Sequence, residues 1–495
     1  MGLTDLRRPA SGVPAGDAIP FTAGGQYHLF FLTSPAGGTH FPERVRTSWA
    51  HASSKDLLDW TEQPVALEPG TGEEPDADGV WTGSLIEADG LFHLFYTGHR
   101  LGSDTPQTIC RATSTDLVSF RKDRENPMLT PDISVFETVD WRDPYVFWNE
   151  AEHCYWMLIA ARLAAGPRWR RGCIALATSP DLINWSIEKE PLYAPGTTFC
   201  PECPEMFELD GVWYLVYSRF SEAAATVYRV ADSPRGPWRV PAREAFDGRR
   251  WYAAKSMPHL ERTSRVFFGW LHDRVDGADT GAWQWGGDFC VPREVAPDGD
   301  GLLSAALPAE YRARFDRPVP YRVAPAASTD APSAPTEITI GASGVTDHRF
   351  INTAGRDYLF ECRLTPQGGS GGFGLLFRVD DDLAGYHLTF DPVRSAVSLV
   401  RWPAPLDTFW GDLVGRGGEP REVDGPRLVE HPLRITAGTG IRCRVRVSDS
   451  LIEAYVDDRV VLSYRAYGEA PHELGFFVED GVLTCEEISL REAGH

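Results

Sequence analysis

The chain has 495 residues, of which 42% are hydrophobic and 12% aromatic, so it is long enough to bury more than one core. Its net charge of −22 argues against nucleic acid and anionic membranes as main partners and leaves small neutral substrates open. No apolar stretch has secretory or membrane-spanning length, so we expect a cytoplasmic protein. Nine cysteines, an odd number, favour reduced core residues over a disulfide framework.

One strand pattern, a turn followed by alternating aromatic and aliphatic residues, recurs five times in the first 270 residues. The copies are separated by 65, 63, 58 and 53 residues, which gives each repeat room for about four short strands. The aligned positions are Tyr27, Phe92, Tyr155, Trp213 and Val266. This spacing predicts a five-bladed β-propeller over residues 1–315.

A second repeat runs in phase with the first and places an aspartate four residues before an aromatic side chain. Asp56, Asp116 and Asp181 occupy this position in the three well-kept copies. Because these aspartates recur, we interpret them as turn residues that bond to the backbone, not as catalytic groups. Acidic residues that break the repeat are better candidates for catalysis.

The second half of the chain has a different pattern. Residues 316–336 are rich in proline and alanine, which predicts an extended linker. Residues 337–495 contain many short segments of period two without a blade repeat, which is typical of a β-sandwich with two sheets. The predicted fold is therefore all-β, a five-bladed β-propeller followed by a C-terminal β-sandwich. An edge of the sandwich offers a place for two chains to pair as a homo-oligomer.

Three acidic residues break the propeller repeat just before its aromatic strand. Asp17, Asp143 and Glu202 precede the aligned positions by 10, 12 and 11 residues, as expected for one structural position with small loop differences. The innermost strands of a propeller converge on one funnel, so these side chains should meet there. Three carboxylates at close range cannot all ionise without cost, and one should act as an acid.

The surroundings of each acid suggest its role. Glu202 stands beside Cys203 in an apolar run that disfavours its ionised form, so we interpret it as the general acid and base. Asp17 would then be the nucleophile that forms a covalent glycosyl intermediate. Asp143, beside Arg142, would stay ionised, hold sugar hydroxyls and stabilise the transition state.

The ordered motifs of the chain resemble glycoside hydrolase family 32, the fructosidases that include invertases, levanases and inulinases. Arg142-Asp143-Pro144 matches the family's Arg-Asp-Pro motif, and Glu202-Cys203-Pro204 matches its acid motif. Residues 49–60, 82–84, 252–255 and 292–294 also follow the family's order. The resemblance implies a retaining hydrolase that releases terminal β-fructofuranosyl units from a small oligosaccharide.

Two departures from the family pattern leave alternatives open. The family's nucleophile usually lies in Trp-x-Asn-Asp-Pro-Asn-Gly, whereas Asp17 follows Gly16 here, and Leu32 begins the segment that replaces the family's glutamine. A fructosyltransferase of the same family is one alternative, and an inverting arabinofuranosidase or xylosidase similar to family 43 is another. A non-catalytic carbohydrate-binding protein is the third, although a dead site has no reason to retain three acids.

Further candidates for substrate contact lie on the predicted funnel strands or at their rim. Large aromatic residues in a propeller pack in the core about as often as they stack on a sugar. The candidates are Arg142, Trp81, Ser84, Trp49, Asp247, Tyr252 and Trp285. Cys200 and Cys203 form a CxxC pair, but no second pair lies at zinc spacing, so we expect no metal and no cofactor.

Overall fold

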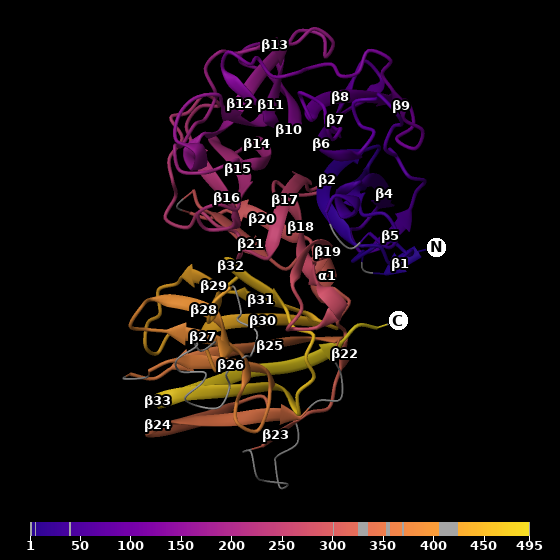
Figure 1. Cartoon of the computed structure of the whole chain (residues 1–495). Helices are drawn as coiled ribbons and strands as arrows, with labels where there is room; N and C mark the ends of the chain where they lie inside the picture. The colour runs from indigo at the N-terminus through magenta and orange to yellow at the C-terminus, as the bar shows by residue number, and fades with distance from the viewer. Residues whose placement is uncertain are drawn as a thin grey trace, which may run out of the picture. The chain divides into compact units, whose positions relative to one another are not determined.

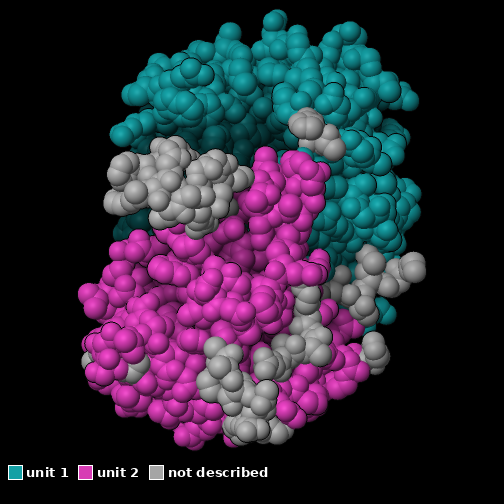
Figure 2. Space-filling view, turned by 60° about the horizontal axis from the view of Figure 1, so that its bottom comes forward, with its two compact units in different colours: residues 1–273, 284–303 teal, residues 274–283, 304–495 magenta. Residues whose placement is uncertain are grey.

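The computed structural model describes all residues except 1, 5, 39–40, 300, 325–334, 353–356, 369–370, 405–423 and 495. Strands dominate these residues (Figure 1), and their one α-helix is the short α1 (Ala309–Ala313). The all-β fold class is therefore confirmed. No helix in the described part of the chain is long and apolar enough to cross a membrane. The chain divides into two compact units, residues 1–273 with 284–303 and residues 274–283 with 304–495 (Figure 2).

Three sheets of the first unit share one plan, in which each antiparallel strand lies beside the next strand of the chain. The first of these sheets contains β6 (Gly79–Ala88), β7 (Leu91–His99), β8 (Gln107–Ser114) and β9 (Arg121–Lys122). The next contains β10 (Phe136–Asn149), β11 (Cys154–Leu163), β12 (Gly172–Ser179) and β13 (Ser186–Ile187). The third contains β14 (Glu202–Leu209), β15 (Val212–Arg219) and β16 (Ala225–Ala231).

A fourth, ten-stranded sheet joins the first strands of the unit to its last. Its early strands are β1 (Gly2–Thr4), β2 (Ala15–Ala23), β3 (Gln26–Thr33), β4 (Ser48–Ser54) and β5 (Asp59–Glu62). Its late strands are β17 (Trp251–Pro258), β18 (Arg265–Arg274), β19 (Trp283–Phe289), β20 (Arg293–Pro297) and β21 (Leu303–Ala306). The two groups meet where Ala15 of β2 pairs with Gly287 of β19.

Five inner strands form a closed ring at the centre of the first unit (Figure 1). Going round this ring, β2 contacts β6, β6 contacts β10, β10 contacts β14, β14 contacts β17, and β17 contacts β2. The five aligned sequence positions fall on β3, β7, β11, β15 and β18, each of which pairs with one of the inner strands. The arrangement is consistent with a propeller.

The repeated aspartates close turns, as their recurrence predicted. In each copy, one side-chain oxygen accepts hydrogen bonds from the backbone N–H groups two and three residues further on, at 2.8–2.9 Å. These residues are Asp56, Asp116 and Asp181. Their carboxylates are engaged with the local backbone, which confirms the structural interpretation.

The second unit is built on one twelve-stranded sheet. Its main strands are β24 (Ile338–Asn352), β25 (Asp357–Pro366), β26 (Phe373–Val379), β27 (Gly385–Asp391), β28 (Ala396–Trp402), β29 (Arg427–Pro432), β30 (Ile441–Ser448), β31 (Leu451–Val456), β32 (Val460–Arg465) and β33 (His472–Glu492). The long β33 pairs with both β25 and β26, so the two layers expected of a sandwich are joined. They enclose a core that includes Phe360, Phe373, Leu462 and Phe476.

The segment predicted as a linker contains two short strands. β22 (Arg317–Pro318) pairs with β33, and β23 (Arg322–Ala324) pairs with β24. The first part of residues 316–336 is therefore hydrogen-bonded to the sheet of the second unit. Its prolines do not prevent this, since proline is tolerated at a sheet edge. Residues 325–334 of that prediction lie outside the described residues.

Arg8 fastens the N-terminal segment to the late strands of the first unit. Its guanidinium lies 2.5 Å from Asp288 and 2.6 Å from Asp273, whose side chains are 10% and 12% exposed. Because Arg8→Ala leaves two largely buried carboxylates without this cation, we expect the free energy of unfolding to fall by about 2–4 kcal/mol in urea unfolding. Arg239→Ala, which breaks an exposed pair with Asp232, should cost less than about 0.5 kcal/mol. Equal losses would contradict this role for Arg8.

Candidate active site

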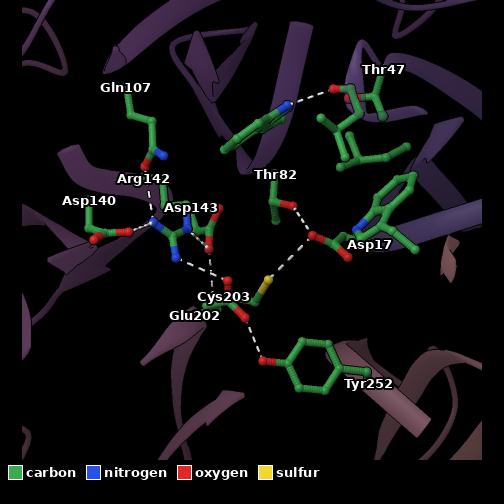
Figure 3. A pocket seen from close by; sticks show the side chains of 14 residues that line it. Asp17, Thr47, Thr82, Gln107, Asp140, Arg142, Asp143, Glu202, Cys203 and Tyr252 are labelled. Atoms are coloured by element: carbon green, nitrogen blue, oxygen red, sulfur yellow. Dashed lines mark hydrogen bonds and ion pairs between the residues drawn. The ribbon is translucent and has the colours of Figure 1, made fainter. Parts of the chain in front are cut away.

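A pocket of about 290 Å³ lies where the inner strands of the first unit meet (Figure 3). Every inner strand contributes to it, and all of its lining residues belong to the first unit. The predicted acids Asp17, Asp143 and Glu202 point into this one space. The structure therefore brings together three side chains that are separated by up to 185 residues in the sequence.

A β-bulge in every inner strand positions these side chains. The pairing shifts between Ala15 and Ala18, Trp81 and Gly83, Arg142 and Tyr145, Glu202 and Glu205, and Tyr252 and Lys255. Backbone φ is positive at Asp143 (57°) and Cys203 (49°), a region that non-glycine residues seldom adopt. A bulge re-aims a side chain, so the same irregularity in each strand turns polar groups toward the centre.

The strand registers correct one expectation about the acids. We expected Asp143 and Glu202 to occupy one structural position, but Arg142 lies opposite Ala160 and Glu202 lies opposite Ser218. These two partners are equivalent when the repeats are aligned, so Glu202 takes the place of Arg142. Cys203 takes the place of Asp143. Counting residues missed this offset because the turn between β10 and β11 is two residues longer than the turn between β14 and β15.

Three donors hold the carboxylate of Asp17. Thr82 Oγ1 donates to Oδ2 at 2.5 Å, Trp270 Nε1 donates to Oδ1 at 3.0 Å, and Cys203 Sγ lies 3.6 Å from Oδ2. Burial raises the pKa of Asp17, the hydrogen bond from Thr82 lowers it, and the charge of Glu202 raises it. The donors fix the direction of the carboxylate within the pocket.

Asp143 is held mainly by the backbone of the neighbouring strand. Its Oδ2 accepts a hydrogen bond from the Cys203 N–H at 2.8 Å, and Arg142 Nε lies 3.8 Å away. The N–H of Asp143 donates to Thr97 Oγ1 at 2.7 Å. Burial raises the pKa of Asp143, whereas the charges of Arg142 and Lys255 lower it. These two cations are therefore what favours the ionised form expected from the sequence.

Glu202 has one cationic and one phenolic partner. Arg142 Nη2 lies 3.0 Å from Oε1, and the Tyr252 hydroxyl donates to Oε2. Burial raises the pKa of Glu202 above its ordinary value, Arg142 lowers it, and Asp143 raises it again. The raised pKa agrees with the interpretation of Glu202 as the proton donor. Because burial raises the pKa of all three acids, the contacts and not this direction distinguish their roles.

Four of the seven predicted substrate-contact residues line the pocket. They are Arg142, Trp81, Tyr252 and Trp285. Arg142 is also bound by Gln107 Oε1 at 3.0 Å and by Asp140 Oδ1 at 2.5 Å, so its guanidinium is oriented on three sides. Trp81 stacks on His99 with ring centroids 4.0 Å apart, which fixes the face that it turns to the pocket.

The other three predicted contact residues have structural roles, which corrects the prediction. Trp49 is fully buried and donates to the Trp81 carbonyl at 3.0 Å. Ser84 is buried and accepts from the Val146 N–H at 2.9 Å. Asp247 forms a fully buried ion pair with Arg293 at 2.6 Å. Each lies within a few residues of a pocket-lining residue in the sequence, but its polar group already has a hydrogen-bond or ion-pair partner within the scaffold.

Sequence reasoning missed several residues that bind Asp17, Arg142 or the backbone around the pocket. Thr82 lies inside a motif that the sequence singled out, and Trp270 lies in the fifth copy of the strand pattern, so both had a signal. Gln107 and Asp140 had none, because neither lies in a repeat or in a motif quoted for the resemblance. Lys255 donates to the Gly83 carbonyl at 2.8 Å, and burial lowers its pKa.

One wall of the pocket is apolar where the sequence departs from the family pattern. Leu32, Val45 and Trp285 line this side. A side chain at Gly16 would overlap the indole ring of Trp285, so the absence of a Cβ there makes room for the tryptophan. Trp285 also packs against Trp270, with ring centroids 5.6 Å apart, and Trp270 is the residue that donates to Asp17. The departure at Gly16 thus affects, through Trp285, the tryptophan that donates to Asp17.

The two cysteines of the CxxC pair are buried. Cys200 and Cys203 are buried thiols, and burial raises the pKa of each well above its ordinary value, which disfavours the thiolate form that binds metals. Within the described ranges, no group of three or more His, Cys, Asp or Glu side chains is placed to hold a metal ion. Cys203 instead supports Asp17 and Asp143.

Comparison with known proteins identifies the family. The Glycosyl hydrolases family 32 N-terminal domain matches residues 18–305, which is more than half of the chain, and the chain belongs to this family. The raffinose invertase of Escherichia coli is 31% identical over 299 residues, covering 56% of this chain and 59% of that protein. The sucrose-6-phosphate hydrolase of Escherichia coli is 29% identical, covering 56% and 58%. The matched part therefore spans less than two thirds of these relatives.

Solved structures share the fold over nearly the whole chain. The sucrose-6-phosphate hydrolase from Lactobacillus gasseri has a TM-score of 0.70 at 18% identity and covers 97% of this chain and 91% of that one. The fructan 1-exohydrolase IIa from Cichorium intybus has a TM-score of 0.69 at 17% identity, with coverage of 98% and 97%. These likenesses support an all-β chain of two β units.

The contact between Gly16 and Trp285 predicts a steric effect on the site. Gly16→Ala should push the indole ring away from the pocket wall and lower kcat/KM about tenfold, because Trp285 packs on the tryptophan that orients Asp17. Gly299→Ala is the matched control, since a Cβ there meets no atom within 4 Å. Kinetics of both variants test this, and an unchanged rate for Gly16→Ala would contradict it.

The crowding of buried acids predicts a pH-dependent stability. The pKa of Asp17 is raised in the folded state. Its contribution to the free energy of unfolding is therefore fully present below the unfolded pKa of about 3.9 and is lost as the pH rises through the folded pKa. Asp17→Asn removes this loss, so its Tm relative to wild type should rise by about 2–4 °C between pH 4 and pH 8. Asp232→Asn is the control: its exposed carboxyl has a lowered pKa and titrates below this range, so its Tm difference from wild type should stay nearly constant from pH 4 to pH 8. A Tm difference between Asp17→Asn and wild type that does not vary with pH would refute the argument.

Proposed function

We propose that this chain is a retaining glycoside hydrolase that releases a terminal β-fructofuranosyl unit from a small oligosaccharide. The observation that carries the proposal is the convergence of Asp17, Asp143 and Glu202 in one pocket of a family 32 domain. Family membership favours this function over the inverting, family 43-like alternative. The names of the relatives, which include invertases and fructan exohydrolases, support the same class of substrate.

The proposed scaffold is a five-bladed propeller over residues 1–315, followed by a β-sandwich over residues 337–495. The closed ring of five inner strands and the two compact units support this division. In it, each inner strand begins a blade, and the ten-stranded sheet is the first and last blades joined through β2 and β19. Cytoplasmic location and pairing of two chains through a sandwich edge remain predictions.

In the proposed mechanism, Asp17 attacks the anomeric carbon while Glu202 protonates the oxygen of the leaving group. The hydrogen bonds from Thr82 and Trp270 hold the Asp17 carboxylate in one orientation, which favours a near-attack geometry. Glu202 then takes a proton from water, and the resulting hydroxide releases the sugar from Asp17. Asp143, held by the Cys203 N–H, accepts hydrogen bonds from sugar hydroxyls.

The size of the pocket favours cleavage at a chain end. A volume of about 290 Å³ lies at the low end of the range for ligand sites, enough for one sugar ring. The rest of the substrate must extend out of the pocket, as in release of a terminal unit. A fructosyltransferase would use the same glycosyl intermediate and differ only in the acceptor that replaces water.

Neutral variants of the two reacting carboxyls test the proposed function. Asp17→Asn and Glu202→Gln should each lower kcat on sucrose at least about 10³-fold, because one removes the nucleophile and the other the proton donor. Glu208→Gln, an exposed position on the same strand as Glu202, is the matched control and should stay active. Thermal unfolding checks that the variants fold, and the anomer first released reports retention. Near-normal turnover in either variant would refute the assigned roles.

A further inference from the structure

Three aromatic side chains form a row on the surface beside the pocket and have no part in the roles above. Trp169 lies in the 3-10 turn η2 (Arg168–Arg170), Phe199 lies just before β14, and Phe220 follows β15. Ring centroids are 5.2 Å apart between Trp169 and Phe199 and 5.7 Å between Phe199 and Phe220. Trp169 is 61% exposed and Phe220 is 42% exposed. A contiguous exposed aromatic patch of this kind is typical of a binding surface and not of a core.

The aromatic row lies at the pocket end of its sheets. β10 begins at Phe136 opposite Leu163, the last residue of β11, and β14 begins at Glu202 opposite Ser218 near the end of β15. The connections that follow β11 and β15 therefore emerge beside the starts of β10 and β14. Those starts carry the pocket-lining residues of both sheets.

A chain of contacts links the row to the pocket wall. The guanidinium carbon of Arg162 lies 3.6 Å from the centroid of the Phe199 ring. Arg162 Nη1 lies 3.4 Å from Asp140 Oδ2, and Asp140 Oδ1 lies 2.5 Å from Arg142 Nη1. Asp140 and Arg142 both line the pocket, so a single side chain, that of Arg162, separates Phe199 from the pocket wall.

Hydrogen bonds fix the three connections that present the rings. The Phe199 N–H donates to Ser221 Oγ at 2.9 Å, and the Gly172 N–H donates to the Thr198 carbonyl at 3.0 Å. Arg162 Nη2 donates to the Arg168 carbonyl at 2.8 Å. The row is therefore held in place before any ligand arrives, which reduces the entropy cost of binding.

We propose that Trp169, Phe199 and Phe220 form a leaving-group subsite that stacks the sugar rings beyond the cleaved bond. The proposal rests on the proposed function, in which Glu202 protonates the leaving oxygen, so the leaving group lies on the side of Glu202. The row comes from the sheet that carries Glu202 and from the sheet next to it in the ring. The pocket holds one sugar ring, and further rings must pass over its rim at this side.

The chemistry of the row suits a neutral sugar chain. The C–H groups on one face of a sugar ring carry partial positive charge and pack well on the negative face of an aromatic ring. A neutral oligosaccharide is also not repelled by a protein of net charge −22. The subsite therefore favours substrates whose leaving group contains two or more sugar units over a disaccharide.

Kinetics on a short and a long substrate test the subsite. Sucrose has a single glucose as leaving group, whereas nystose has a trisaccharide. Trp169→Ala and Phe220→Ala should each lower kcat/KM for nystose about fivefold to tenfold and for sucrose less than about twofold. Trp148→Ala, an aromatic residue 37% exposed at the far end of β10, is the matched control and should change neither value. Equal losses on both substrates, or no loss on nystose, would overturn the proposal.

A binding measurement separates failure of the subsite from failure of the proposed function. If the wild-type chain hydrolyses neither sugar, the proposed function is wrong, and the subsite is then tested by calorimetry with nystose. In a Glu202→Gln background, Trp169→Ala should weaken nystose affinity about fivefold to tenfold. Unchanged affinity would overturn the subsite whatever the outcome of the kinetics.

Discussion

The structure of the first unit depends on keeping three carboxylates buried side by side where five strands converge. Such a cluster is unfavourable by itself, since burial and mutual repulsion both penalise the charged forms. It persists because each acid has fixed donors, and one residue, Cys203, supplies two of them. Cys203 donates through its backbone to Asp143 and through its thiol to Asp17, while its neighbour Glu202 faces the pocket.

The β-bulges connect this electrostatic cluster to the fold. A regular strand alternates its side chains between two faces, and an extra residue at one level lets neighbouring residues share the direction of the pocket. The positive φ angles at Asp143 and Cys203 show where the backbone takes on this strain. The scaffold therefore supplies both the stability and the distortion that the site requires.

Much of this arrangement could be predicted from the sequence, and what could not has a physical reason. Period-two strands and their spacing predicted the all-β fold, and departures from the repeat predicted Asp17, Asp143 and Glu202. Spacing alone could not show that Glu202 is equivalent to Arg142, because the turn after the inner strand differs in length between the two sheets and changes the residue count. Trp49 and Ser84 illustrate a second limit, since residue type does not tell whether a polar group faces the pocket or is already bonded inside the scaffold.

The way in which the ring closes has a consequence for the order in which the site is assembled. The strand that carries Asp17 leaves the ribosome before its partner β19 and the residue Trp270, which follow more than 250 residues later. A nascent chain that stops short of these late strands holds the Asp17 carboxylate without the indole that orients it. The set of contacts around Asp17 is thus complete only after the late strands have been synthesised.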